Sequence, residues 1–88
     1  MTFDRTLVAL AVYRRVIDEG PRSGDSPAKV RLWSRDCLTA AVDVREAFWH
    51  DSGANPGTRN ACFTMSVDEV RRAVARARTP YDRPNGQP

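Results

Sequence analysis

The side chains of this chain that are best suited to chemistry are two cysteines and one histidine, Cys37, His50 and Cys62. Together they could ligate a metal, and a thiol beside the imidazole could act as a nucleophile. A structural zinc site, however, takes four soft ligands, commonly in close pairs such as C-x2-C, and these residues are spread along the chain without such a pair. We therefore expect no bound metal. Cys37 is expected as a small core residue, and His50 as a favourable charge at a helix C-terminus.

The sequence motifs of catalytic and nucleotide-binding sites are also missing. No serine lies in a G-x-S-x-G context, and the chain has neither a P-loop nor a G-x-G-x-x-G motif. No orienting group or oxyanion feature accompanies the thiols. The sequence therefore predicts a protein that is not an enzyme, takes no cofactor and implies no small-molecule substrate.

The composition is that of an ordinary globular domain. Hydrophobic residues make up 41% of the 88 residues and charged residues 28%, which suits one small domain. The net charge of +3 permits nucleic-acid binding without requiring it. Thirteen Arg against one Lys, with eleven Ala, is typical of a GC-rich coding sequence, as in actinobacteria or their phages. The arginines are therefore not by themselves a sign of phosphate chemistry.

The cysteines and the apolar segments indicate the compartment. The apolar run 7–13 is too short for a secretory signal, follows Asp4 and lacks a cleavage site of small residues. No stretch approaches the eighteen apolar residues of a membrane span. We expect a cytoplasmic protein with reduced thiols and no membrane contact. A Cys37–Cys62 bridge stays open as the alternative.

Three segments have the periodicity of amphipathic helices, at about 4–19, 27–50 and 67–78. The first should end at Gly20, which accepts a left-handed cap, and at Pro21, which cannot continue the hydrogen-bond ladder.

Two of the helix starts are marked by capping residues. Ser26 can cap an orphan N–H of the second helix, and Pro27 at the first helical position loses no hydrogen bond. Ser66 and Glu69 have the spacing of a capping box at the start of the third helix.

The predicted fold is all-α, a small three-helix domain over residues 1–78 with a long central helix. An irregular segment at 51–65 precedes the third helix, and a flexible tail at 79–88 follows it. A small α+β fold with a short strand near 59–65 is the alternative.

The long central segment carries two apolar stripes. The second stripe lies roughly a quarter-turn from the first and consists of Leu38, Val42 and Trp49. Val8 and Val12 fall on the polar side of the first helix, and if they lie beside this second stripe one apolar patch results. The main stripe, which we assign to the core, contains Val30, Trp33, Cys37, Ala40, Ala41, Val44, Ala47 and Phe48.

The second stripe leads to our first hypothesis on function. A helix with two apolar sides needs two surfaces to pack against, and tryptophan is enriched at interaction hot spots. We expect a small non-catalytic protein-interaction module, an accessory protein of a phage or an actinobacterium that binds a host protein or a second copy of itself. The candidate interface residues are Trp49, Leu38, Val42, Val8 and Val12; burial under the third helix is the alternative for this surface.

The second hypothesis is a nucleic-acid-binding or regulatory protein that uses the basic third helix. Its candidate residues are Arg71, Arg72, Arg76 and Arg78. A helix-turn-helix motif needs two helices joined by three or four residues, whereas the predicted connection is about fifteen residues long. The aromatic residues are also not interleaved with these arginines. We therefore favour a solvated basic face for these arginines.

Overall fold

The computed structural model describes residues 2–78, which form four α-helices and no strand. The all-α prediction is confirmed, and its three helices lie within about one residue of their predicted bounds. The alternative with a strand near 59–65 is wrong, and the tail expected at 79–88 lies outside the described residues. The helices are α1 (Asp4–Asp18), α2 (Pro27–Asp51), α3 (Arg59–Phe63) and α4 (Val67–Arg78), with a 3-10 turn, η1 (Pro56–Thr58), before α3.

The segment at 51–65 is more ordered than the sequence predicts. The side chain of Asn55 accepts the N–H of Gly57 at 2.8 Å, and this bond starts η1, which leads directly into α3. A helix of only five residues is too short to show a period in the sequence, so the segment was predicted as irregular.

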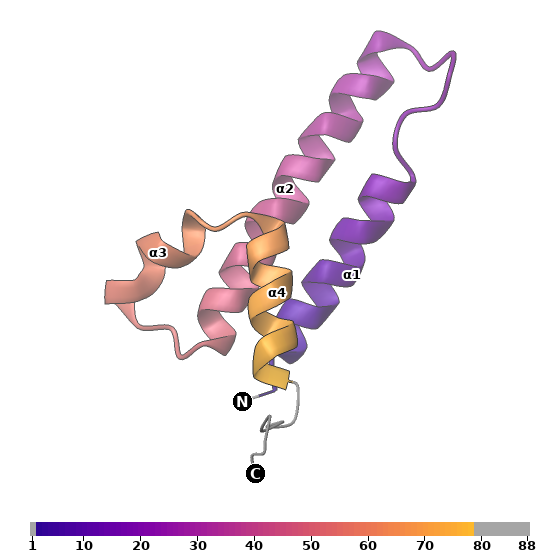
Figure 1. Ribbon diagram of the computed structural model, residues 1–88. Helices are drawn as coiled ribbons and strands as arrows, with labels where there is room; N and C mark the ends of the chain where they lie inside the picture. The colour runs from indigo at the N-terminus through magenta and orange to yellow at the C-terminus, as the bar shows by residue number, and fades with distance from the viewer. Residues whose placement is uncertain (1, 79–88) are drawn as a thin grey trace.

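Helices α1 and α2 form a long antiparallel hairpin, and α2 is unbroken over its 25 residues (Figure 1). At the upper end of the hairpin, the indole N–H of Trp33 donates to the carbonyl of Val16 at 2.7 Å. A Cβ at Gly20 would lie 2.9 Å from the Trp33 ring, so glycine is needed there for close approach. The predicted left-handed cap at Gly20 is wrong, because the glycines with positive φ are Gly24 and Gly53.

The lower end of the hairpin is held by a carboxylate that crosses between the two helices. Asp51, the last residue of α2, accepts from the Thr6 backbone N–H at 2.8 Å and from the Thr6 hydroxyl at 2.7 Å. Thr6 is fully buried, so these bonds satisfy a donor in the first turn of α1 that would otherwise be an orphan. Phe3, which precedes α1 at a φ of 58°, stacks on Phe48 with the ring centres 5.9 Å apart.

The two predicted helix starts are confirmed. Ser26 accepts the N–H of Lys29 at 3.3 Å, with Pro27 in the first turn of α2. Ser66 and Glu69 form the capping box of α4: the Ser66 N–H donates to the carboxylate at 2.7 Å, and the Glu69 N–H donates to the hydroxyl at 3.0 Å.

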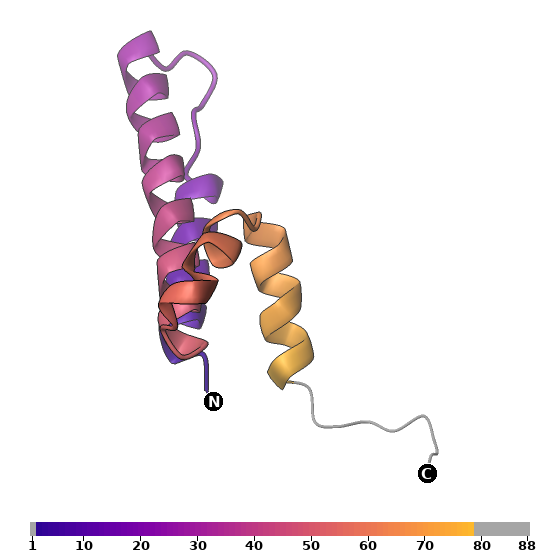
Figure 2. The same ribbon diagram turned by 90° about the vertical axis from the view of Figure 1, so that its left-hand side faces the viewer.

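Helix α4 supplies one wall of the core and covers only part of the hairpin. At 1.5 Å per residue its twelve residues span about 18 Å, whereas α2 spans about 37 Å. Figure 2 shows α4 on one side of the hairpin only. The opposite face of the hairpin and its upper half are therefore left without a covering helix. The buried core cluster consists of Phe3, Ala41, Val44, Val67, Val70 and Val74.

Candidate functional site: exposed apolar surfaces of the hairpin

The hairpin exposes large apolar side chains that folding of one chain does not bury. Leu38 is 70% exposed and Val8 is 66% exposed. Contiguous apolar surface of this kind marks interaction sites more often than isolated exposed residues do. In the part of the chain that the structure describes, the exposed large hydrophobic residues all belong to α1 and α2. They are Val8, Val12, Ile17, Val30, Leu32, Leu38 and Val42.

Val8 and Val12 lie in a groove on the hairpin face that α4 leaves open. This hairpin groove has a volume of about 730 Å³ and is lined by α1 and α2 alone. Ala9, Ala40 and Ala47 are more buried than the two valines and form its floor. An apolar floor with a charged rim suits a protein segment better than a small polar ligand. The exposed charged residues and the histidine around it are Asp4, Arg5, Asp43, Glu46 and His50.

Leu38 and Val42 lie on a different surface, the side of α2 that faces away from α1. They are roughly half a turn around the helix from Ala40 and Ala47, which face the first helix. Both are exposed, at 70% and 45%. We call this side the outer edge of α2; it comprises Arg31, Arg35, Leu38, Val42, Glu46 and Trp49, of which Glu46 also lies on the rim of the hairpin groove.

The structure does not bring Val8 and Val12 beside Leu38 and Val42. The two pairs lie on separate surfaces, because Val8 and Val12 line the groove opposite α4, whereas Leu38 borders the groove where α4 begins. The five candidate interface residues, Trp49 included, therefore form two surfaces rather than one patch.

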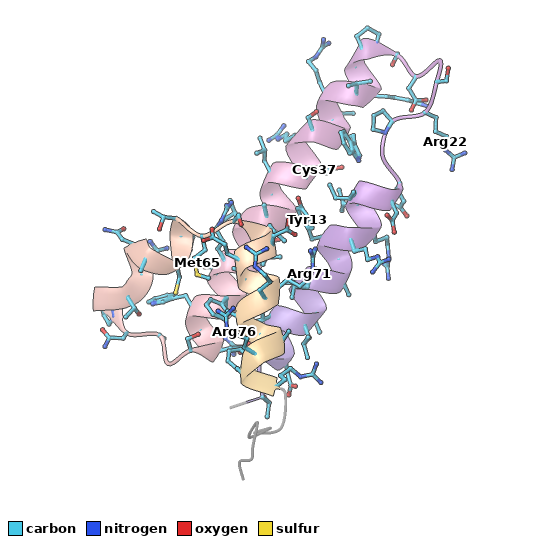
Figure 3. The ribbon with its side chains drawn as sticks, viewed as in Figure 1. Tyr13, Arg22, Cys37, Met65, Arg71 and Arg76 are labelled. Atoms are coloured by element: carbon cyan, nitrogen blue, oxygen red, sulfur yellow. The ribbon has the colours of Figure 1, made fainter. Side chains whose placement is uncertain are left out.

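Near the start of α4, two smaller grooves remain between this helix and the hairpin. One of about 390 Å³ contains Tyr13, Cys37 and Leu38, and the other, of about 340 Å³, contains Tyr13 and Arg71. Figure 3 shows Tyr13 and Arg71 at this junction, with Cys37 higher on α2. These grooves mark the point at which α4 stops covering the hairpin.

Trp49 is half-buried and holds the loop that follows α2. Its indole N–H donates to the Asn55 carbonyl at 2.9 Å. The guanidinium of Arg59 lies 5.3 Å from the Trp49 ring centre and 4.5 Å from that of Phe63. Trp49 therefore fixes α3 against α2, and only part of its ring can serve another chain. The signal for this role is the turn sequence at 55–57, which brings the chain back onto the helix.

The four candidate arginines of α4, Arg71, Arg72, Arg76 and Arg78, are all exposed. Arg71 is engaged in an ion pair with Asp68. Only three residues separate α3 from α4, so the objection that the connection is too long for a helix-turn-helix is wrong. However, Asp68 and Glu69 occupy the N-terminal turn of α4, the part of a recognition helix that contacts base edges, and they would repel phosphates there.

The thiols and the imidazole do not come together as a chemical site. Cys62 is buried, Cys37 is half-buried, and both are free. Burial raises the pKa of the Cys37 thiol, and the neighbouring charge of Asp36 raises it further, so the thiol is protonated at neutral pH. Within residues 2–78 no group of three His, Cys, Asp or Glu residues is arranged to hold a metal ion.

Within the described residues, no helix has both the length and the apolar character needed to cross a bilayer.

The chain matches no family model, no curated protein and no solved structure. Its function is therefore inferred from its own surfaces.

Proposed function

We propose that the protein is a small non-catalytic interaction module that binds another protein chain through the exposed apolar side chains of its helical hairpin. The observation that supports this most directly is the distribution of exposed apolar residues, all of which lie on α1 and α2 within residues 2–78. Burying the side chains of Val8, Val12, Leu38 and Val42 in a complex would contribute about 1–2 kcal/mol each.

The hairpin offers a rigid platform for such a complex. Its two ends are tied by the Trp33–Val16 and Asp51–Thr6 hydrogen bonds, so little conformational entropy is lost when a partner docks. As a further part of this proposal, the protein acts as an accessory protein in the cytoplasm of an actinobacterium or in its phage; the excess of Arg over Lys and the many Ala residues are typical of the GC-rich coding sequences of such sources.

The proposal is tested with a photo-reactive phenylalanine analogue placed at one position at a time in the full chain inside producing cells. Position 12 reports on the hairpin groove and position 42 on the outer edge of α2. Position 72, which is also exposed but lies on α4, is the control. We expect recurrent protein adducts at position 12 or at position 42. An adduct at position 12 should disappear when Val8 is replaced by serine, and an adduct at position 42 should disappear when Leu38 is replaced by serine. Adducts at neither position, or adducts only at 72, would contradict the proposal.

A second candidate function, nucleic-acid binding, is supported by the short turn between α3 and α4 and by the exposed Arg72 and Arg76. If α4 binds a nucleic acid, replacing both arginines by alanine should weaken binding and reduce its dependence on salt, because fewer counterions are released. Replacing Arg5 and Arg15 of α1 provides the control with the same change of charge. Binding that is insensitive to salt would exclude this candidate.

A further inference from the structure

We propose that the outer edge of α2 pairs with the same edge of a second copy of this chain, with the two helices antiparallel. This inference rests on the proposed function and names its partner. It predicts a symmetric dimer in which the same surface serves on both sides.

The outer edge has the spacing of a helix–helix seam. Its residues recur at steps of four and three along α2, which is the period that keeps one line of side chains facing a partner helix. Leu38 and Val42 occupy the middle of this line, with charged residues toward both ends. An apolar centre with a charged periphery is the usual anatomy of a protein–protein interface.

The charges of the edge are complementary only in one orientation. In an antiparallel pair with Leu38 opposite Val42 of the second copy, Arg31 lies opposite Trp49, and Arg35 lies within one residue, about 1.5 Å along the axis, of Glu46. Arg45, which is level with Arg35, donates to the Met65 carbonyl of its own chain. The symmetric dimer then contains two ion pairs between Arg35 and Glu46 and two contacts between Arg31 and the Trp49 ring. In a parallel pair Arg31 and Arg35 would each face their own copies, and the repulsion selects the antiparallel arrangement.

The edge is open to a partner. Figure 2 looks onto this side of the molecule and shows the upper part of α2 uncovered, while α3 lies in front of its lower end, where it packs on Trp49. Arg35 and Glu46 are exposed, and within residues 2–78 neither takes part in an ion pair or a hydrogen bond between side chains. Both charges are therefore available for a second chain.

The hairpin groove is a poorer surface for a second copy. Its rim carries Asp4, Asp43 and Glu46 against a single arginine, Arg5, so two such rims would repel each other. One pair of helices is a small interface, so we expect a dissociation constant on the order of 10 µM.

The test is sedimentation analysis of the full chain over a range of concentrations, with charge-reversal variants. Glu46→Arg alone and Arg35→Glu alone should each weaken the dimer about tenfold or more, because two ion pairs become two repulsions. An equimolar mixture of the two variants should form a heterodimer of about wild-type affinity, since every facing pair is then of opposite sign. Asp43→Arg, which makes the same change of charge on the groove side of α2, should leave dimerisation unchanged.

The outcomes separate this inference from the proposed function. Recovery in the mixture cannot come from a folding defect, so it would establish the antiparallel edge. A chain that stays monomeric into the millimolar range, or a dimer that none of the edge variants weakens, would overturn the inference. Protein adducts at position 12 or 42 to a different chain would then still support the interaction function, whereas adducts at neither position would remove both.

Discussion

Asp51 is the only carboxylate that joins α1 to α2 among the hydrogen bonds of the described residues, and replacing it with alanine removes this link at the lower end of the hairpin. Two donors of Thr6 lose their acceptor, and Thr6 is fully buried, so water does not readily replace it. Hydrogen bonds to a charged group are worth about 1.5–3 kcal/mol each, and we take the lower end because Asp51 is only half-buried. The free energy of unfolding should therefore fall by about 3 kcal/mol.

For a protein of this size, that loss lowers the midpoint of thermal unfolding by about 12–24 °C. Urea denaturation followed by circular dichroism gives the free energy directly, at a concentration low enough to keep the chain monomeric. Asp25→Ala is the matched control, because its carboxylate also accepts a backbone N–H, that of Arg22 at 2.7 Å, but in an exposed loop. It should cost at most about 0.5 kcal/mol.

A double-mutant cycle separates the two bonds. Thr6→Val removes the hydroxyl and keeps the backbone N–H, so it should cost about 1 kcal/mol in the wild-type chain. In the Asp51→Ala background the same change should cost much less, because the hydroxyl has already lost its acceptor. If Asp51→Ala is as mild as Asp25→Ala, the carboxylate does not hold the hairpin and the reasoning is refuted.

Three further predictions concern single sites. Gly20→Ala should destabilise the chain by about 1–3 kcal/mol, because its Cβ would press on the Trp33 ring, and equilibrium unfolding in urea measures this. Val70→Ala, at a fully buried site of α4, should cost about 2 kcal/mol, whereas Val42→Ala should leave the stability of the monomer nearly unchanged. The hydrogen bond from the Ser66 backbone lowers the pKa of Glu69, so the capping box stabilises the fold above the ordinary pKa of a glutamate and loses this effect as the pH falls through the folded-state pKa. Wild type and Glu69→Gln should therefore differ more in stability at pH 6 than at pH 3; equal differences would contradict this.

The sequence predicted the helices well because their signals are local. Ser26 and the Ser66–Glu69 pair mark helix starts through bonds that span three residues. The period of the main stripe of α2 correctly predicts the buried residues Ala40, Ala41 and Val44, but its assignment of Val30 to the core is wrong, because Val30 lies at the upper end of α2, beyond the reach of α4, and is exposed. The role of Gly20 was misjudged because it depends on Trp33, thirteen residues away in the chain, whose ring packs against it.

The sequence predicted which residues belong to the candidate surfaces, but not how these residues are grouped on the folded protein. The side of each helix that a neighbour covers depends on where α4 docks, and a periodic pattern does not encode that docking. Val8 and Val12 were therefore grouped with Leu38 and Val42, although α1 and α2 direct the two pairs to different surfaces. Trp49 was predicted as an interface candidate, with burial under the third helix as the alternative; its contact with Asn55 was not predicted because it depends on the loop after α2.

The most direct test of the paired outer edge is an isotope-filtered NMR experiment on a millimolar sample in which half of the chains carry carbon-13. The antiparallel dimer predicts contacts between the Leu38 methyl groups of one copy and the Val42 methyl groups of the other. Contacts between Phe3 and Phe48 within one chain confirm that the fold is intact. Intact core contacts without any intermolecular signal from Leu38 or Val42 would contradict the account.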